Sequence, residues 1–273
     1  DTAHVQDAVL GFARRFGFQA HLLVHAEGLL LTLEDGSGFR TKIGQPVTGF
    51  AVNMDALVAI GRIGVADGSI AGIARQLDAI EHAPRRYPPW LVVIGVGVTA
   101  AALARLFGGA WPVVATSLLV GMVTQALRQV FAARGTNPIA GAGVAAFGGG
   151  ATGAIVMRAF PGESPTLCLV AAGMILVPGV PLINGVRDMV GSHVGNGIAR
   201  LLFGTVTVLA IAFGLFLAAD MAGDALPVGA RFPPLALPQD LLFSALAGAG
   251  YALLFNVPPR LAWACCLCAL AGH

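Results

Sequence analysis

Apolar runs about as long as a membrane span fill the sequence from Trp90 onward, and they constrain the fold more than any other feature. About twenty apolar residues are enough for a helix to cross the hydrocarbon core of a bilayer. Since lipid offers no hydrogen bonds, the backbone of such a run must satisfy its own polar groups as a helix. We predict spans at 90–107, 111–131, 139–159, 167–187, 199–219 and 240–256, with a further one starting at 261. The sequence therefore predicts a multi-pass α-helical membrane protein.

The composition agrees with this interpretation. Of 273 residues, 56% are hydrophobic and 11% are charged, which is too apolar for a soluble domain. The net charge is only +2, and the arginines are scattered at the ends of apolar runs, so nothing indicates a nucleic-acid partner. The sequence contains no ATP-binding motif. We expect contact with the lipid bilayer and no cofactor.

Residues 1–85 are amphipathic instead of continuously apolar, which indicates a small α+β domain outside the membrane. Apolar spacing predicts helices and strands in turn: a helix at 5–16, strands at 19–25, 28–33 and 39–47, and helices at 54–66 and 69–81. Ser69 is expected to cap the last of these helices.

Two groups of residues in the chain resemble metal ligands, but neither forms a complete set. His21 and His25 share one face of a predicted strand with Glu27 nearby, and no further ligand accompanies them. Cys265 and Cys268 have helical spacing in an apolar run, with no third type of metal ligand nearby. We predict no metal site.

Arginines at the ends of the predicted spans indicate the orientation of the chain. When the spans alternate, seven arginines fall on one side and three on the other. The first group is Arg85, Arg86, Arg128, Arg134, Arg187, Arg200 and Arg260, and the second is Arg105, Arg158 and Arg231. Because positive charge favours the cytoplasmic side, the N-terminal domain is predicted to be cytoplasmic, with the protein in the inner membrane.

The fourth predicted span is interrupted by two prolines. Pro178 and Pro181 would each remove a backbone hydrogen bond, so we expect one helix to end before Pro178 and the next to restart at Leu182. Irregular backbone at membrane depth is tolerated only inside protein or beside a wet cavity. A helix that begins inside the membrane directs its positive end toward the break, as discontinuous transporter helices do toward an anionic substrate.

Polar residues gather on and after this half-helix. The candidate site consists of Pro178, Gly179, Pro181, Asn184, Arg187, Asp188, His193, Asn196 and Arg200. Our hypothesis is that Asp188 couples transport to protons or orders the substrate, with Arg187 as its charge partner and His193 as a second candidate proton carrier. A proline kink followed by an Arg–Asp pair at the membrane surface is an alternative that the sequence leaves open.

The same stretch resembles the signature of the threonine/serine exporter (ThrE) family, and it is especially similar to the smaller component of the family's two-protein bacterial form. The matching residues are Leu176 to Met189 and Gly195 to Arg200, with support from Arg86 to Trp90, Phe107 to Trp111 and Leu254 to Pro258. The resemblance covers nearly the whole chain.

This resemblance implies a secondary exporter of small carboxylates, either threonine/serine-type amino acids or dicarboxylates such as succinate. Export needs an energy source, and because the sequence has no ATP-binding motif we expect protons to drive it. It also implies a five-span domain at 86–220, an external Pro-rich linker at 221–239 and the truncated start of a second membrane domain at 240–273. A half-transporter or scaffold subunit that needs a second-domain partner, or associates with itself, is an alternative. Hydrolysis in the cytoplasmic domain is a weaker one, because no nucleophile–base pair is evident.

Overall fold

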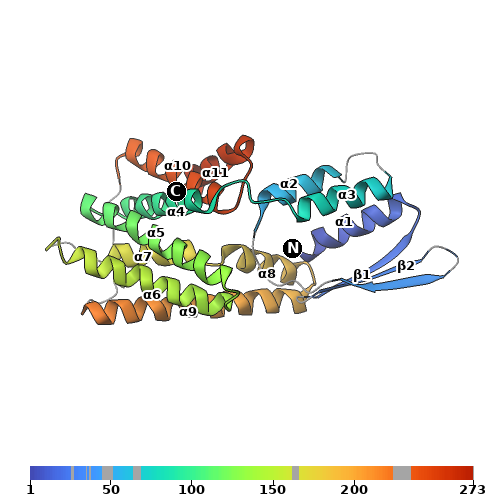
Figure 1. Ribbon diagram of the computed structural model, residues 1–273, viewed down its shortest axis with the longest axis horizontal. Helices are drawn as coiled ribbons and strands as arrows, with labels where there is room; N and C mark the ends of the chain where they lie inside the picture. Colours follow the sequence, from blue (N-terminus) through green and yellow to red (C-terminus); the bar gives the residue numbers. More distant parts are fainter. Residues whose placement is uncertain are drawn as a thin grey trace. The chain divides into compact units, whose positions relative to one another are not determined.

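The computed structural model describes residues 1–25, 28–34, 36, 38–44, 52–63, 69–161, 166–223 and 235–272. Over these residues the protein is mostly helical, with one small sheet near the N-terminus (Figure 1). The chain divides into two compact units, residues 1–52, 57–82 and 178–206 in the first and residues 53–56, 83–177 and 207–273 in the second. The second half of the broken span therefore belongs to the same unit as the N-terminal residues.

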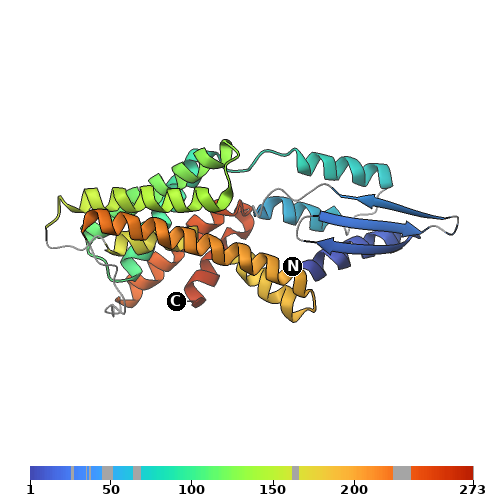
Figure 2. The same cartoon turned by 90° about the horizontal axis from the view of Figure 1, so that it is seen from below.

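The first unit contains an antiparallel three-stranded meander, which Figure 2 shows from its face. Its strands are β1 (Gln19–His25), β2 (Gly28–Glu34) and β3 (Phe39–Ile43). Helix α1 (Thr2–Arg15) packs against β1. The predicted strands at 19–25 and 28–33 are confirmed. The third, predicted at 39–47, ends at Ile43, and residues 45–47 and Glu27 lie outside the described residues.

The remaining helices of this unit are α2 (Met54–Ile63), α3 (Ile70–Glu81), α8 (Gly179–Val190) and the first part of α9 (Val194–Ala222). Ser69 caps α3 as predicted, because its hydroxyl accepts a hydrogen bond from the Gly72 N–H at 3.2 Å. The expected residues 64–66 of α2 lie outside the described part of the chain.

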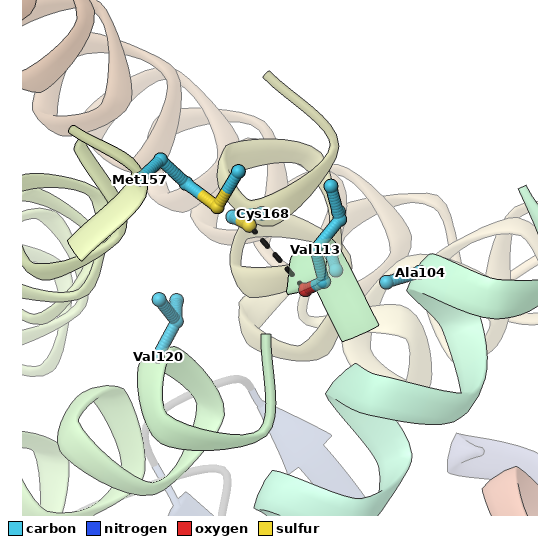
Figure 3. Close-up of a cluster of buried hydrophobic side chains, with 6 residues drawn as sticks. Ala104, Val113, Val120, Met157 and Cys168 are labelled. Carbon is cyan, nitrogen blue, oxygen red and sulfur yellow. Dashed lines mark hydrogen bonds between the residues drawn. The ribbon is translucent and has the colours of Figure 1, made fainter. Parts of the chain in front are cut away.

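The second unit is a helical bundle. It comprises α4 (Pro89–Leu106), α5 (Trp111–Ala133), α6 (Pro138–Met157), α7 (Thr166–Leu176), the rest of α9, α10 (Leu237–Leu254) and α11 (Pro259–Gly272). Helix α5 packs against α4, α6 and α7. One buried cluster joins four of these helices and includes Ala104, Val113, Val120, Met157 and Cys168 (Figure 3).

Glycines allow the helices of this bundle to approach closely. A Cβ added at Gly150 of α6 would lie 2.7 Å from the Ala218 side chain of α9, and one at Gly121 of α5 would lie 2.7 Å from Ala100 of α4. Neither position has room for a side chain, so these glycines serve packing.

By length and composition, four helices of the described chain are able to cross a membrane: α4, α5, α6 and α9. Helices α7 and α8 pass the same test only as a bent pair, which is either one broken span or a re-entrant loop, so the described residues have up to five such spans. The predicted span at 240–256 forms α10, but α10 is not among these candidates, since its first turn carries Pro238, Gln239 and Asp240. Helix α11 is apolar but shorter.

Helices α10 and α11 are nevertheless built into the second unit through Asn256, in the turn between them. The Asn256 side chain accepts a hydrogen bond from the Arg86 N–H at 3.1 Å and donates one to Asn53 at 2.7 Å. The Tyr87 hydroxyl donates to the Val257 carbonyl at 2.9 Å. Burial raises the pKa of the Tyr87 hydroxyl, which keeps this donor protonated. The C-terminal residues are thus fixed to the start of α4.

Candidate functional site

The break in the fourth span lies where the prolines predicted it, but the second helix begins earlier than expected. Helix α7 ends at Leu176 and α8 begins at Gly179 instead of Leu182. Pro181 is therefore the third residue of α8. The first four N–H groups of a helix have no partner within the helix, so a proline there costs no hydrogen bond. The first helical bond of α8 runs from the Leu182 N–H to the Pro178 carbonyl, at 3.2 Å.

Helices α8 and α9 form a tight hairpin because glycines lie where the two helices touch, and each leaves room for atoms of the other helix. A Cβ at Gly185 would lie 2.8 Å from Leu201, and a Cβ at Gly197 would lie 2.8 Å from the Gly185 carbonyl. In the turn between the helices, Ser192 has a left-handed conformation with φ of 65°. The His193 N–H donates to the Asp188 carbonyl at 2.7 Å and closes the end of α8. In this turn, the contact of His193 with Asp188 comes from the His193 backbone.

Asp188 of α8 is the central buried charge of this unit, with none of its surface exposed. Its Oδ1 accepts a hydrogen bond of 2.7 Å from the Thr2 N–H, at the first turn of α1. Unpaired N–H groups and the helix dipole make a helix N-terminus favourable for a carboxylate. Helix α1 thus contributes to holding the charge of Asp188.

The charge partner of Asp188 is Arg200, not Arg187 as predicted from the sequence. Nε of Arg200 lies 3.2 Å from Oδ2 of Asp188, and the Arg200 side chain is only 21% exposed. Arg187 instead lies 3.8 Å from the carboxylate of Asp1, with 67% of its side chain exposed. Neighbouring residues of a helix point in different directions, so the Arg187 side chain diverges from that of Asp188.

Asn196 of α9 extends this network to the sheet. Its Nδ2 donates to the Thr2 hydroxyl at 3.1 Å and to the Val24 carbonyl of β1 at 2.8 Å. Asn196 and Thr2 are both buried. One amide thus connects α9 to both α1 and β1, and the hairpin and the N-terminal elements share a single polar core.

The structure therefore brings together three of the predicted site residues, Asp188, Asn196 and Arg200. Pro178 lies just before α8 and Asn184 lies within it. Neither is a partner in the described hydrogen bonds of Asp188. Sequence reasoning missed Thr2 entirely. The start of α1 could have been predicted, since Asp1 is a typical capping residue and accepts a 2.9 Å hydrogen bond from the His4 N–H. No local sequence pattern indicates that this start lies next to Asp188.

Chemically, the arrangement is a buried carboxylate, that of Asp188, held by other groups of the same chain. Arg200 and the N-terminus of α1 supply positive charge, and the Asp188 carboxylate supplies the negative charge. Oδ2 is buried and accepts no hydrogen bond among the described residues, although it faces Arg200. The described residues contain no group of three or more His, Cys, Asp or Glu that could hold a metal ion.

Several apolar helices, a bent pair of helices among them, and an ion pair that joins the second helix of this pair to α9 are features found in membrane transporters. The family described as "Putative threonine/serine exporter" matches residues 1–222 of this chain. The chain belongs to this family.

Curated relatives agree with the family and differ in the substrate that their names give. A "Probable succinate transporter subunit YjjP" of Klebsiella aerogenes is 34% identical over 142 residues, which is 51% of this chain and 55% of the relative. The Escherichia coli K12 protein of the same name is 30% identical over 154 residues, 56% of this chain and 59% of the relative. A "Probable threonine/serine exporter" of Mycobacterium tuberculosis is 26% identical over 129 residues, 46% of this chain and 23% of the relative.

The matched part of this chain thus spans a little over half the length of the two succinate transporter subunits and less of the third relative. No solved structure matches the chain.

Proposed function

We propose that this chain acts in secondary-active export of small carboxylate-bearing metabolites, either threonine/serine-type amino acids or dicarboxylates such as succinate, with protons as the coupling ion. The observation that carries the proposal is the ion pair between the buried Asp188 of α8, the second half of the broken pair of helices, and Arg200 of α9. A buried charge near the membrane is costly unless it is paired or has a function, and chains of such residues mark proton and substrate pathways. Alternating access around the α7–α8 break is the proposed mechanism.

The test is transport by the full chain in proteoliposomes, comparing wild type with Asp188→Asn. If Asp188 couples transport to protons, Asp188→Asn keeps exchange of substrate down its own gradient and loses uptake driven by a pH gradient. Equal loss of both activities at normal protein yield assigns Asp188 to substrate binding. Retention of both removes Asp188 from the mechanism.

A second form of this function is a half-transporter that works only with a partner. Two relatives carry the word subunit in their names, which supports this form. The same proteoliposomes, prepared with and without a protein that carries the family's second membrane domain, separate the two forms. Transport by this chain alone contradicts the need for a partner.

We also propose that the N-terminal domain and the turn around Ser192 lie on the cytoplasmic side, with the linker before α10 outside. Single cysteines at Ser192 and at Leu237, in a variant whose four native cysteines are replaced, can be labelled with an impermeant reagent in oriented vesicles. Both positions are exposed. Labelling of Ser192→Cys from outside, with Leu237→Cys protected, reverses the assignment.

A further inference from the structure

The three-stranded sheet of the first unit has two edges, and the chain treats them differently. Strands β1 and β3 are the outer strands of the meander (Figure 2). Along the outer side of β1, the Asn196 amide donates to the Val24 carbonyl at 2.8 Å, and the Gln6 amide donates to the Leu22 carbonyl at 3.5 Å. These side chains occupy acceptors that a further strand would need, so the β1 edge is closed by α1 and α9.

Strand β3 forms the other edge, and each residue of Phe39–Ile43 is exposed. Just beyond the strand, the Gly44 N–H donates to the Leu29 carbonyl at 2.7 Å, which fixes the register of hydrogen bonds between β2 and β3. Hydrogen-bonded pairs of an antiparallel ladder occur at every second residue, so the even-numbered residues of β3 direct their backbone groups toward β2. The backbone groups that point outward are those of Phe39, Thr41 and Ile43. An edge of this kind is a template for pairing with another strand.

The side chains of β3 are divided by their chemistry between the two faces of the strand. Arg40 and Lys42 lie on one face, because residues two apart in a strand share a face. None of the described ion pairs includes either of them. Phe39 and Ile43 lie on the opposite face, where they are 78% and 77% exposed. The open edge is therefore basic on one face and apolar on the other.

We propose that β3 is the docking edge for an extended segment of another protein, in which acidic and apolar residues alternate. The segment adds a fourth, antiparallel strand, and its backbone pairs with the outward groups of β3. Its acidic side chains lie opposite Arg40 and Lys42, in the non-hydrogen-bonded pairs where facing side chains approach most closely. Its apolar side chains cover Phe39 and Ile43. This interaction goes beyond the proposed transport function and does not depend on it.

The charges on β3 argue against a second copy of the chain as the occupant. Two β3 strands that pair antiparallel about Thr41 place Arg40 of one copy opposite Lys42 of the other, and like charges in opposed positions are destabilising. A lipid surface would satisfy the basic and apolar side chains, but it has no strand backbone to pair with the outward N–H and carbonyl groups. An acidic strand satisfies the side chains and the backbone together.

The first experiment measures binding of a short fluorescent peptide, alternating glutamate and valine, to the purified full chain in detergent by fluorescence anisotropy. Arg40→Glu/Lys42→Glu is expected to bind it at least about tenfold more weakly, because both cross-strand charge pairs become repulsive. This variant is expected to bind a lysine–valine peptide instead, which the wild type does not bind. Arg14→Glu/Arg75→Glu makes the same change in net charge at exposed positions of α1 and α3, and it is expected to bind as wild type does.

A second comparison tests the backbone pairing. Because the Thr41 N–H points outward, Thr41→Pro removes this donor and leaves the ladder between β2 and β3 in place, as proline is tolerated on the open side of an edge strand. Thr41→Val is the control for the hydroxyl contact of 2.9 Å with Thr32. Thr41→Pro is expected to weaken peptide binding at least about tenfold, whereas Thr41→Val keeps it. Circular dichroism compares the folding of the two variants, and the charge exchange tests the proposal independently of them.

Failure of the wild type to bind the glutamate–valine peptide overturns the proposal, and so does undiminished binding by Arg40→Glu/Lys42→Glu or by folded Thr41→Pro. Amide hydrogen exchange in β3, measured without peptide, identifies other occupants. Slower exchange in nanodiscs that contain phosphatidylglycerol than in nanodiscs of phosphatidylcholine alone assigns the edge to an anionic membrane surface. Protection that grows with protein concentration assigns it to a second copy. Either result overturns the acidic segment as the occupant.

Discussion

Asp188 and Arg200 lie on consecutive helices of a tight hairpin, with Nε of Arg200 3.2 Å from Oδ2 of Asp188 and both side chains largely withdrawn from solvent. The carboxylate is held at the same time by the backbone of Thr2, far away in the sequence. This pair therefore has two consequences, one for stability and one for the connection between the hairpin and the N-terminal elements.

Arg200→Gln is expected to destabilise the protein by about 3–5 kcal/mol, because it leaves the buried charge of Asp188 without a partner. Arg187→Gln removes an exposed pair of 3.8 Å and should cost less than about 1 kcal/mol. Unfolding of the two variants in detergent, followed by circular dichroism, compares them directly. Equal effects of the two substitutions would show that Arg200 is not the main partner of Asp188.

Asn196→Ala is expected to loosen the N-terminal elements selectively. The substitution removes the hydrogen bonds that the Asn196 amide donates to the Thr2 hydroxyl and to the Val24 carbonyl. The Val24 carbonyl then lacks the Asn196 donor, which is unfavourable for a partly buried acceptor. Amide hydrogen exchange should become faster in α1 and β1, while exchange in α4 and α5 stays unchanged. Asn184→Ala, on α8 but outside the described bonds of Asp188, is the control. Unchanged exchange in α1 would contradict the role given to Asn196.

Gly185→Ala is expected to cost about 1–3 kcal/mol, because the new methyl group would lie 2.8 Å from Leu201 and 3.1 Å from the Gly197 carbonyl. Gly195→Ala in the same hairpin is the matched control. A Cβ at Gly195 meets nothing within 4 Å, and alanine favours helix by up to about 1 kcal/mol over glycine. Thermal unfolding of both variants gives the comparison, and a neutral Gly185→Ala would mean that the hairpin is looser than described.

Replacement of Pro178 and Pro181 together by alanine is expected to allow a continuous helix from α7 into α8, with folded yield kept and transport reduced. Pro138→Ala, at the first position of α6 where proline breaks nothing, is the control. Substrate counterflow in proteoliposomes is the measurement. Full activity of the double variant would make the break a simple kink with no part in transport.

The sequence by itself determined the parts of this protein that depend on local spacing. Apolar run length gave the helices α4, α5, α6 and α9, and the two prolines located the end of α7. Ser69 was recognisable as a cap because a cap acts on N–H groups only two or three residues away. The start of α8 was missed by three residues, because Pro181 is tolerated throughout the first turn and so does not mark where that turn begins.

Only the tertiary structure decided which residues meet at Asp188. From spacing alone, the adjacent Arg187 was the natural partner, yet a helix points consecutive side chains in different directions. Arg200 reaches Asp188 because Gly185 and Gly197 let α8 and α9 approach, and Thr2 reaches it because α1 begins beside this carboxylate. Contacts between separate helices depend on how their backbones pack, and no local pattern in the sequence encodes that arrangement.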